Sequence, residues 1–216
     1  MKRMGLLRMF TKFLNLDSEK QDRIVNAAMK EFAQKGYDLA STNEMVKEAG
    51  ISKGLLFHYF KNKKQLYLFL FDYCYDMIVE EFYQKVDLSE DDFFKRTRDA
   101  VMIKMELLTG YPDIFQFMEE ALLEDSAEVK AELEKKKKEF IDINMEKFFE
   151  NIDYSKFRED VDLKIVLKII TFTFEKLSDE ALYKAKLSPT HEIDYEKVRL
   201  EAEDYFEVLM KCFYKQ

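Results

Sequence analysis

The chain has 216 residues, of which 47% are hydrophobic, with only 5 Gly, 2 Pro and a formal net charge of −8. So few helix breakers predict long helices that enclose either one core or a small head and a larger body. Cys74 and Cys212 lie far apart without a CxxC pair or a nearby histidine. This spacing argues against a disulfide framework or a zinc site and favours a reducing cytoplasm, and we expect no metal and no cofactor.

The sequence also argues against a membrane protein. Arg8 and Lys12 interrupt the apolar residues near the N-terminus, and no small-residue cleavage site follows, so a secretory signal is not indicated. The longest apolar run, Ile165–Phe174, contains Lys168 and is too short to span a bilayer. We therefore expect a cytoplasmic protein without a membrane partner.

Residues 1–16 mix basic with large apolar side chains and allow three interpretations. In the first, they are a basic arm that reaches along DNA. In the second, they are a frayed terminus. In the third, the sequence starts from a codon upstream of the real start codon. The basic residues are Lys2, Arg3, Arg8 and Lys12. Beyond them, Asp17 and Ser18 predict the start of a helix, which Gly36 ends.

Residues 42–60 predict two short helices joined by a tight turn. Thr42 offers a side-chain oxygen to cap the first helix, and Gly50 ends it because glycine adopts the left-handed conformation readily. Ser52 then caps the second helix. This arrangement places a second helix in the DNA major groove, although many helical corners share it.

The segment Ser52–Leu66, SKGLLFHYFKNKKQL, resembles the recognition helix and the next helix start of the tetracycline-repressor (TetR) family of bacterial transcriptional regulators. The same family pattern is matched by Thr42, by Ala49-Gly50-Ile51, and upstream by Phe32, Gly36 and Tyr37. The resemblance covers roughly residues 18–70. It implies an all-α fold with a small three-helix head that carries the helix-turn-helix and a larger helical body.

The resemblance assigns DNA-facing roles to Thr42, Ser52, Lys53, Gly54, Leu55, His58, Tyr59 and Lys63. Lys53 is expected to reach base edges or phosphate, and Gly54 to allow close approach to the backbone. Tyr59 and Lys63 would hold phosphates. Phe57 departs from the family, which often has Tyr there, so a hydroxyl contact is lost.

The charge is divided between two predicted domains. Residues 1–64 carry 13 Lys and Arg against 7 Asp and Glu, whereas residues 65–216 are strongly acidic. A basic head on an acidic body is expected when only the head meets phosphates. We therefore predict a DNA-binding head over residues 1–64 and an effector-binding and dimerisation domain over residues 65–216.

After the head, Lys61, Asn62 and Lys63 are expected to start a long helix that runs to about Lys85. Its segment Leu66–Ile78 is apolar on nearly every side and must be covered on several faces. The resemblance implies that this helix moves when a ligand enters the body. Further helices are expected to reach Gly110, to begin at Pro112, and to run from Ser126 to about Phe149. The run Lys135–Lys138 is expected to be a solvated face.

The last two predicted helices, roughly residues 160–186 and 194–214, carry apolar stripes larger than one body needs. Such a surplus suggests a subunit interface, and the resemblance implies a four-helix homodimer contact. The expected interface residues are Ile169, Phe172, Val198, Tyr205 and Leu209.

An effector cavity is implied by the resemblance alone, because Phe, Met and Tyr in the body could equally form a core. We place its polar groups at Tyr73, Glu106 and Glu119 as a guess. No catalytic constellation occurs: neither histidine lies in a metal-binding spacing, and adjacent pairs such as Glu80-Glu81 point to different helix faces.

The sequence therefore predicts a transcriptional regulator rather than an enzyme. We expect a homodimeric repressor that binds a palindromic double-stranded DNA operator and is released by a small apolar or aromatic effector. The alternative is a helical sensor or interaction protein whose head binds a protein partner instead of DNA. Salt separates the two, because only a phosphate-bound head loses affinity steeply as salt rises.

Overall fold

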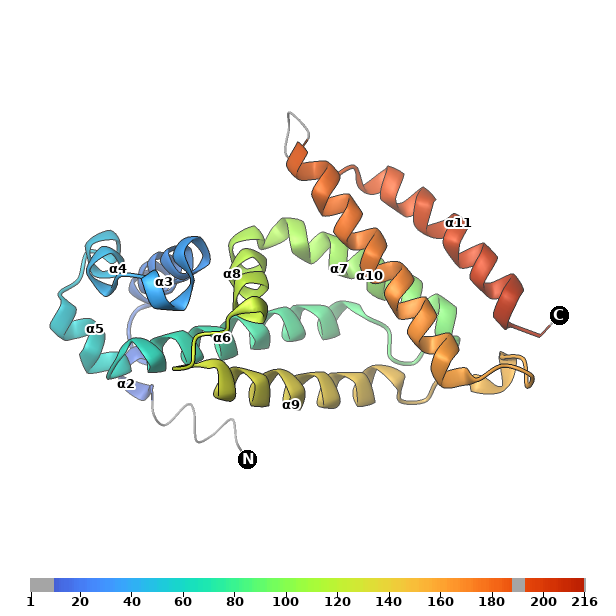
Figure 1. Ribbon diagram of the computed structural model, residues 1–216, viewed down its shortest axis with the longest axis horizontal. Coiled ribbons are helices and arrows are strands. Elements are labelled where there is room, and N and C mark those ends of the chain that lie inside the picture. Colours follow the sequence, from blue (N-terminus) through green and yellow to red (C-terminus); the bar gives the residue numbers. More distant parts are fainter. Residues whose placement is uncertain (1–9, 188–192, 216) are drawn as a thin grey trace. The chain divides into compact units, whose positions relative to one another are not determined.

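The computed structural model describes residues 10–187 and 193–215. Over these residues the protein is all-α, without a β-strand, and only an isolated bridge pairs Phe157 with Tyr214. The helices follow one another in the order drawn in Figure 1. They are α2 (Thr11–Leu14), α3 (Ser18–Leu39), α4 (Thr42–Ala49), α5 (Lys53–Phe60), α6 (Lys63–Lys85), α7 (Phe93–Gly110), α8 (Pro112–Leu123), α9 (Lys130–Phe149), the 3-10 helix η1 (Tyr154–Lys156), α10 (Leu163–Leu187) and α11 (Tyr195–Phe213). None of the helices in the described part is both long and apolar enough to cross a bilayer.

The chain divides into two compact units. The first unit holds the chain up to Ile78 together with Tyr111–Asp142. The second unit holds Val79–Gly110 and the chain from Ile143 onwards. The first unit therefore joins the helix-turn-helix to the beginning of α6, to α8 and to the beginning of α9.

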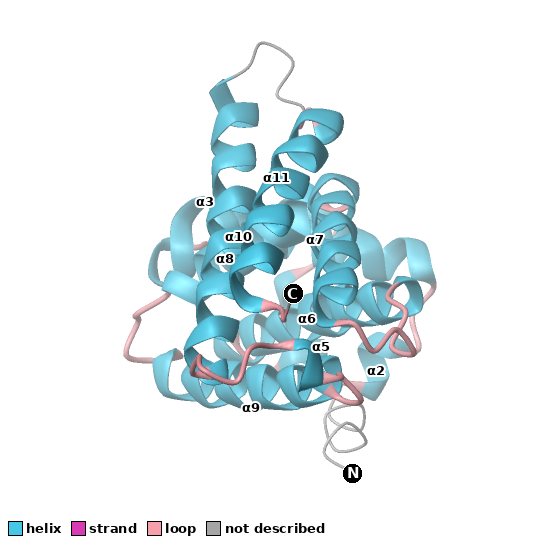
Figure 2. Cartoon of the chain, turned by 90° about the vertical axis from the view of Figure 1, so that its right-hand side faces the viewer, coloured by secondary structure: helices cyan, strands magenta, loops and turns pink. Residues whose placement is uncertain are grey.

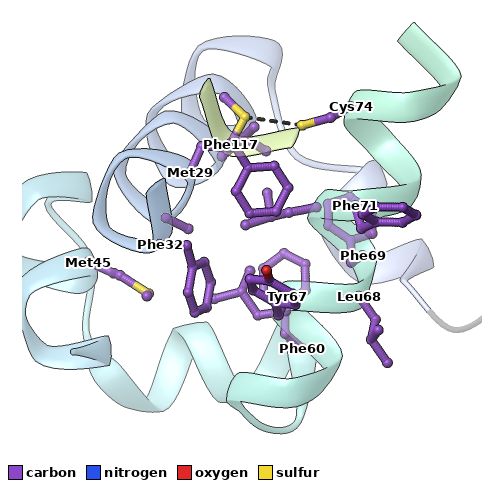
Figure 3. Packing of buried hydrophobic residues seen from close by; sticks show 14 of the residues in the cluster. Met29, Phe32, Met45, Phe60, Tyr67, Leu68, Phe69, Phe71, Cys74 and Phe117 are labelled. Carbon is purple, nitrogen blue, oxygen red and sulfur yellow. Dashed lines mark hydrogen bonds between the residues drawn. The ribbon is translucent and has the colours of Figure 1, made fainter. Parts of the chain in front are cut away.

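Aromatic residues form the centre of the first unit. The ring of Tyr67 lies 4.8 Å from Phe32 and 5.5 Å from Phe117, so α3, α6 and α8 meet there (Figure 3). The apolar stretch of α6 from Leu66 to Phe71 is buried without interruption. This burial confirms that the beginning of α6 is covered on several faces.

The short helix α2 belongs to the same core. Phe13 is fully buried, and its ring lies 4.8 Å from Phe60 and 5.2 Å from Phe69. Phe10 is 3% exposed and lies 4.8 Å from Phe69. Phe10 and Phe13 are therefore part of this core, and Thr11 and Lys12 between them are exposed. The other basic residues of the predicted arm, Lys2, Arg3 and Arg8, lie outside the described residues.

In the second unit α10 and α11 lie side by side, as Figure 2 shows, and both contact α7. The rings of Phe174 and Phe206 stack at 4.0 Å, and Phe206 lies 6.2 Å from Phe94. Arg96 is fully buried and donates to the carbonyl oxygens of Leu88, Glu90, Phe148 and Glu150 at 2.6 to 2.8 Å. One guanidinium thus ties the segment before α7 to the end of α9.

Several predicted helix boundaries are confirmed. Asp17 caps α3 by accepting the N–H of Lys20 at 2.9 Å. Gly36 interrupts α3 with φ 65° and ψ 179°, and Pro112 is the first residue of α8. The capping role predicted for Thr42 is wrong, because Ser41 occupies the N-cap and makes no side-chain cap.

The prediction that Lys135–Lys138 form a solvated face is wrong for two of the four. Lys136 donates to both carboxylate oxygens of Asp72, at 2.5 and 2.7 Å. Lys137 donates to the carbonyl of Leu122 at 2.8 Å. Sequence could not reveal these contacts, because their acceptors lie on other helices.

Candidate nucleic-acid interface

The turn between α4 and α5 has the geometry that its sequence predicts. Gly50 is left-handed, with φ 65° and ψ 38°, and its N–H donates to the carbonyl of Lys47 at 3.3 Å. The N–H of Ile51 donates to the carbonyl of Val46 at 3.0 Å. Ser52 then caps α5 by accepting the N–H of Leu55 at 3.2 Å. The two helices and their turn form a helix-turn-helix.

Aromatic packing fixes which side of α5 faces outward. Leu56, Tyr59 and Phe60 are buried, and Phe60 is held among the rings of Phe13 and Phe69 at 4.8 and 5.2 Å. The opposite side of α5 is consequently exposed. It presents a cation, a residue without a side chain and an imidazole, a set that suits close approach to a phosphate backbone.

The structure brings most of the predicted DNA-facing residues together at this helix-turn-helix. Ser52, Lys53, Gly54 and His58 are exposed, and Thr42, Leu55 and Lys63 are half-buried. Tyr59 is only 8% exposed, and its ring packs 6.1 Å from Phe13. The ammonium of Lys53 lies 5.9 Å from the centre of the half-buried Phe57 ring, so the two side chains lie on adjacent parts of the outer surface.

Lys63 contacts backbone carbonyls of the same chain, which the sequence did not reveal. Its ammonium donates to the carbonyls of Tyr37 at 2.8 Å, Asp38 at 3.1 Å and Ala40 at 3.4 Å. It also lies 4.6 Å from the centre of the Tyr37 ring. Lys63 therefore ties the end of α3 to the start of α6. A phosphate contact by Lys63 would compete with these carbonyls.

A second set of polar contacts holds the same turn from the other side. The carboxylate of Glu124, just after α8, accepts the N–H of Tyr37 at 2.7 Å. The hydroxyl of Ser126 donates to the carboxylate of Asp38 at 2.7 Å. A Cβ at Gly36 would lie 3.5 Å from the Glu124 carboxylate, and the positive φ there favours glycine in any case. The segment that leads into α4 is thus fixed on two sides.

Lys61 is a feature of this surface that sequence reasoning missed. It follows α5 with φ 63° and ψ −50°, one of two non-glycine residues with positive φ in the described part of the chain. The N–H of Asn62 donates to the carbonyl of Phe60 at 2.7 Å, which closes a γ-turn around Lys61. No glycine or asparagine marks the position, so no sequence signal could have located it.

The guessed effector residues are divided between the two units. Tyr73 is half-buried and stacks 6.0 Å from Phe69, whereas Glu119 is exposed on α8 of the same unit. Glu106 belongs to the second unit, where it is exposed and pairs with Lys85. A role for these three residues in binding an effector stays a prediction.

The predicted interface residues divide into two groups. Ile169 and Tyr205 are each 43% exposed and Phe172 is 59% exposed. Val198 and Leu209 are only 7% and 9% exposed, because they point into the second unit itself. Only the first group has apolar surface to offer a second subunit.

The fold and this site define the chain as a helical protein with a helix-turn-helix DNA-binding head. Residues 24–69 match the family model described as bacterial regulatory proteins, tetR family. The Uncharacterized HTH-type transcriptional regulator YuxN of Bacillus subtilis (strain 168) is 47% identical over 58 residues, which are 27% of this chain and 20% of that protein. Only about a fifth of that relative's length is matched.

Two longer matches extend beyond the head. The Fatty acid metabolism regulator protein of Bacillus subtilis (strain 168) is 23% identical over 158 residues, 73% of this chain and 80% of that protein. The crystal structure of a TetR family transcriptional regulator from Chloroflexus aurantiacus J-10-fl matches with a TM-score of 0.69, at 22% identity, over 95% of this chain and 98% of that one. Residues 24–69, which contain the helix-turn-helix, thus match the tetR family in sequence, and nearly the whole chain shares its fold with a TetR family transcriptional regulator.

Proposed function

We propose that this protein is a homodimeric repressor whose two heads bind a palindromic operator and whose body binds an apolar effector that releases it. The observation that carries the proposal is the exposed side of α5, where Ser52, Lys53, Gly54 and His58 gather beyond a glycine turn. Helices held in this way enter the major groove with their first residues toward the base edges. Lys53 is the first residue of α5 and is the candidate for base reading.

Operator selection from a pool of random-sequence duplexes, followed by a salt titration, tests the proposal. We expect a palindromic consensus and an affinity that falls steeply as salt rises. Lys53→Ala should weaken the selected operator by about five- to 150-fold, equivalent to ~1 to 3 kcal/mol, and a scrambled duplex much less. A head that prefers a protein partner would give no consensus and little dependence on salt, which would support the alternative.

The homodimer is proposed to form through the outer faces of α10 and α11. Support comes from the apolar side chains left exposed there, at Ile165, Ile169, Phe172, Tyr205 and Val208. Each is 43% exposed or more, unlike Val198 and Leu209. Two copies of such a face would cover each other, as packed helix pairs do in bundles.

The effector is proposed to carry a long acyl chain. A relative that aligns over most of its length bears the name fatty acid metabolism regulator protein, and an acyl chain belongs to the apolar class expected here. We expect a long-chain fatty acid to weaken operator binding by about five- to 150-fold, a coupling of ~1 to 3 kcal/mol. If it raises the melting temperature without changing operator affinity, the coupling is wrong.

A further inference from the structure

Lys61 stands in a backbone conformation that a lysine adopts only at a cost. Its φ of 63° and ψ of −50° lie in the left-handed half of conformational space, at the centre of a γ-turn closed by Asn62 and Phe60. Such conformations persist in non-glycine residues only where their surroundings determine them, and they cluster at functional sites. Glycine would adopt this conformation without strain.

Residues on both sides of Lys61 are held by contacts elsewhere in the first unit. On one side Phe60 is fully buried among the rings of Phe10, Phe13 and Phe69. On the other side the ammonium of Lys63 holds three carbonyls of the α3–α4 segment. The chain turns at position 61, between the end of α5 and the start of α6.

Three lysines lie at this junction, and their ammonium groups differ. Lys63 is bonded to carbonyls, and Lys64 pairs with Glu132 at 2.6 Å. Lys61 is exposed, and no carboxylate among the described residues pairs with it. Of the three, Lys61 alone has an ammonium available for an external anion.

The position of Lys61 indicates which anion. Lys61 directly follows Phe60, the last residue of α5, and its N–H still donates to the carbonyl of Phe57 at 2.9 Å, so Lys61 stands at the C-terminal end of the recognition helix. A recognition helix contacts base edges with its N-terminal residues, which leaves its C-terminal end beside the sugar-phosphate backbone. A helix C-terminus carries partial negative charge and would repel a phosphate unless a cation stands there.

We infer that Lys61 is a DNA-phosphate contact of the head, held at the end of the recognition helix by a strained γ-turn. This inference rests on the proposed DNA-binding function and adds a residue that the family resemblance did not assign. The ammonium of Lys61 would neutralise a phosphate there, which an unstrained glycine could not do.

The test exploits the opposite effects that glycine should have on stability and on binding. Lys61→Gly should raise the melting temperature by about 2 to 4 °C, because the strain is relieved. It should also weaken binding to a fluorescein-labelled mixed-sequence duplex of about 30 base pairs by about five- to twentyfold at low salt. The slope of log affinity against log salt should fall by about 0.9 for each head bound.

Two further variants separate charge from backbone. Lys61→Arg keeps the cation and should keep both the affinity and the salt slope. Lys138→Ala removes the same charge from an exposed position on α9 and should leave the slope unchanged. The inference is overturned if Lys61→Gly retains the wild-type salt slope, even if its affinity falls. If the wild-type protein itself binds no duplex at low salt, the proposed function fails together with this inference.

Discussion

Each unit contains a cation that binds backbone carbonyls, and the two cations differ in exposure. In the second unit Arg96 is fully buried and its guanidinium reaches four carbonyls. In the first unit Lys63 is half-buried and its ammonium reaches three carbonyls. The planar, multidentate guanidinium suits a permanent internal tie, whereas an ammonium exchanges partners readily. The contacts of Arg96 therefore suit a permanent internal link in the second unit, whereas the proposed DNA contact of the head would compete for the contacts of Lys63.

The exposed surfaces of the two units also differ in polarity. The exposed side of α5 carries Lys53, Gly54 and His58, which suit a hydrated polyanion. The exposed side of α10 carries Ile169 and Phe172, which gain by leaving water. The face of α5 therefore suits the proposed contact with DNA, and the face of α10 suits the proposed contact between subunits.

Replacing the buried Arg96 should have the largest effect on stability. Arg96→Met would leave four carbonyls of the second unit without their donor, and we expect a loss of about 3 to 5 kcal/mol in the free energy of unfolding. Chemical denaturation followed by circular dichroism measures it. Lys95→Met, at an exposed neighbour, should change stability by less than about 1 kcal/mol. Similar losses for both variants would mean that the carbonyl contacts of Arg96 contribute little.

An acidic residue on the apolar face should separate the subunits. Phe172 is 59% exposed, so Phe172→Glu costs little in the isolated chain but would bury an unpaired charge in the proposed interface. We expect the dimer dissociation constant to rise by about 30-fold to 1,000-fold, equivalent to ~2 to 4 kcal/mol. Sedimentation over a concentration series measures it.

The matched control lies on another helix of the same unit. Ile143 on α9 is 62% exposed, and Ile143→Glu should leave the dissociation constant unchanged. If Ile143→Glu dissociates the protein and Phe172→Glu does not, the interface lies on α9. A wild-type protein that sediments as a monomer at micromolar concentration would contradict a dimer altogether.

Features that depend on one residue and its neighbours in sequence were predictable. Gly50 sets the turn of the helix-turn-helix, because few residue types adopt a left-handed backbone. Ser52 sets the cap of α5, because few side chains can accept a backbone N–H that has no partner within the helix. The all-α fold followed from the same local rules. The apolar stripes of α10 and α11 were predicted correctly. Periodicity does not say which residues of a stripe pack against other helices of the same chain. Val198 was therefore assigned to the interface, although it is buried within the second unit.

Features that depend on distant partners were not predictable. Lys63 was expected to meet phosphate, and its carbonyl partners are separated from it by 23 to 26 residues. Lys61 has an unusual backbone because Phe60 and Lys63 are both fixed by other elements. Neither position carries a residue type that signals its role.

Removing the carbonyl contacts of Lys63 should have a smaller effect on stability than removing those of Arg96, and it should also change DNA binding. Lys63→Ala deletes the donor to three half-exposed carbonyls, and we expect a loss of about 1 to 2 kcal/mol in the free energy of unfolding. If Lys63 also holds a phosphate, operator and scrambled duplex should weaken alike, and the salt slope should fall by about 0.9 for each head. Denaturation and a salt titration on the same samples measure both. An unchanged salt slope would leave Lys63 with its internal role alone.

The last expected effect is a pH dependence of folding stability. Its direction should differ between a carboxylate of the second unit and one of the first. Asp92 in the second unit is buried, which by itself raises its pKa, but hydrogen bonds from Lys156 at 3.0 Å, from the N–H of Lys95 at 3.1 Å and from Tyr214 at 3.2 Å lower that pKa overall. The carboxylate of Asp72 in the first unit accepts hydrogen bonds from the ammonium of Lys136, and there burial prevails and raises the pKa of Asp72. More donors around the Asp92 carboxylate explain the opposite directions.

The signs follow from linkage between folding and protonation. A lowered pKa in the folded state means that ionised Asp92 stabilises the fold above its unfolded pKa of about 3.9, and that this contribution is lost as pH falls through the folded value. A raised pKa means that Asp72 takes up its proton more readily when folded, so its contribution to stability grows as pH falls from above the folded pKa toward the unfolded one. Asp92→Asn should therefore cost about 1 to 2 kcal/mol at neutral pH, and the deficit should shrink in acid. The deficit of Asp72→Asn relative to the wild type should instead widen as pH falls from 7 toward 4. Urea denaturation at a series of pH values measures both curves, and deficits that change in the same direction would contradict this account of the two carboxylates.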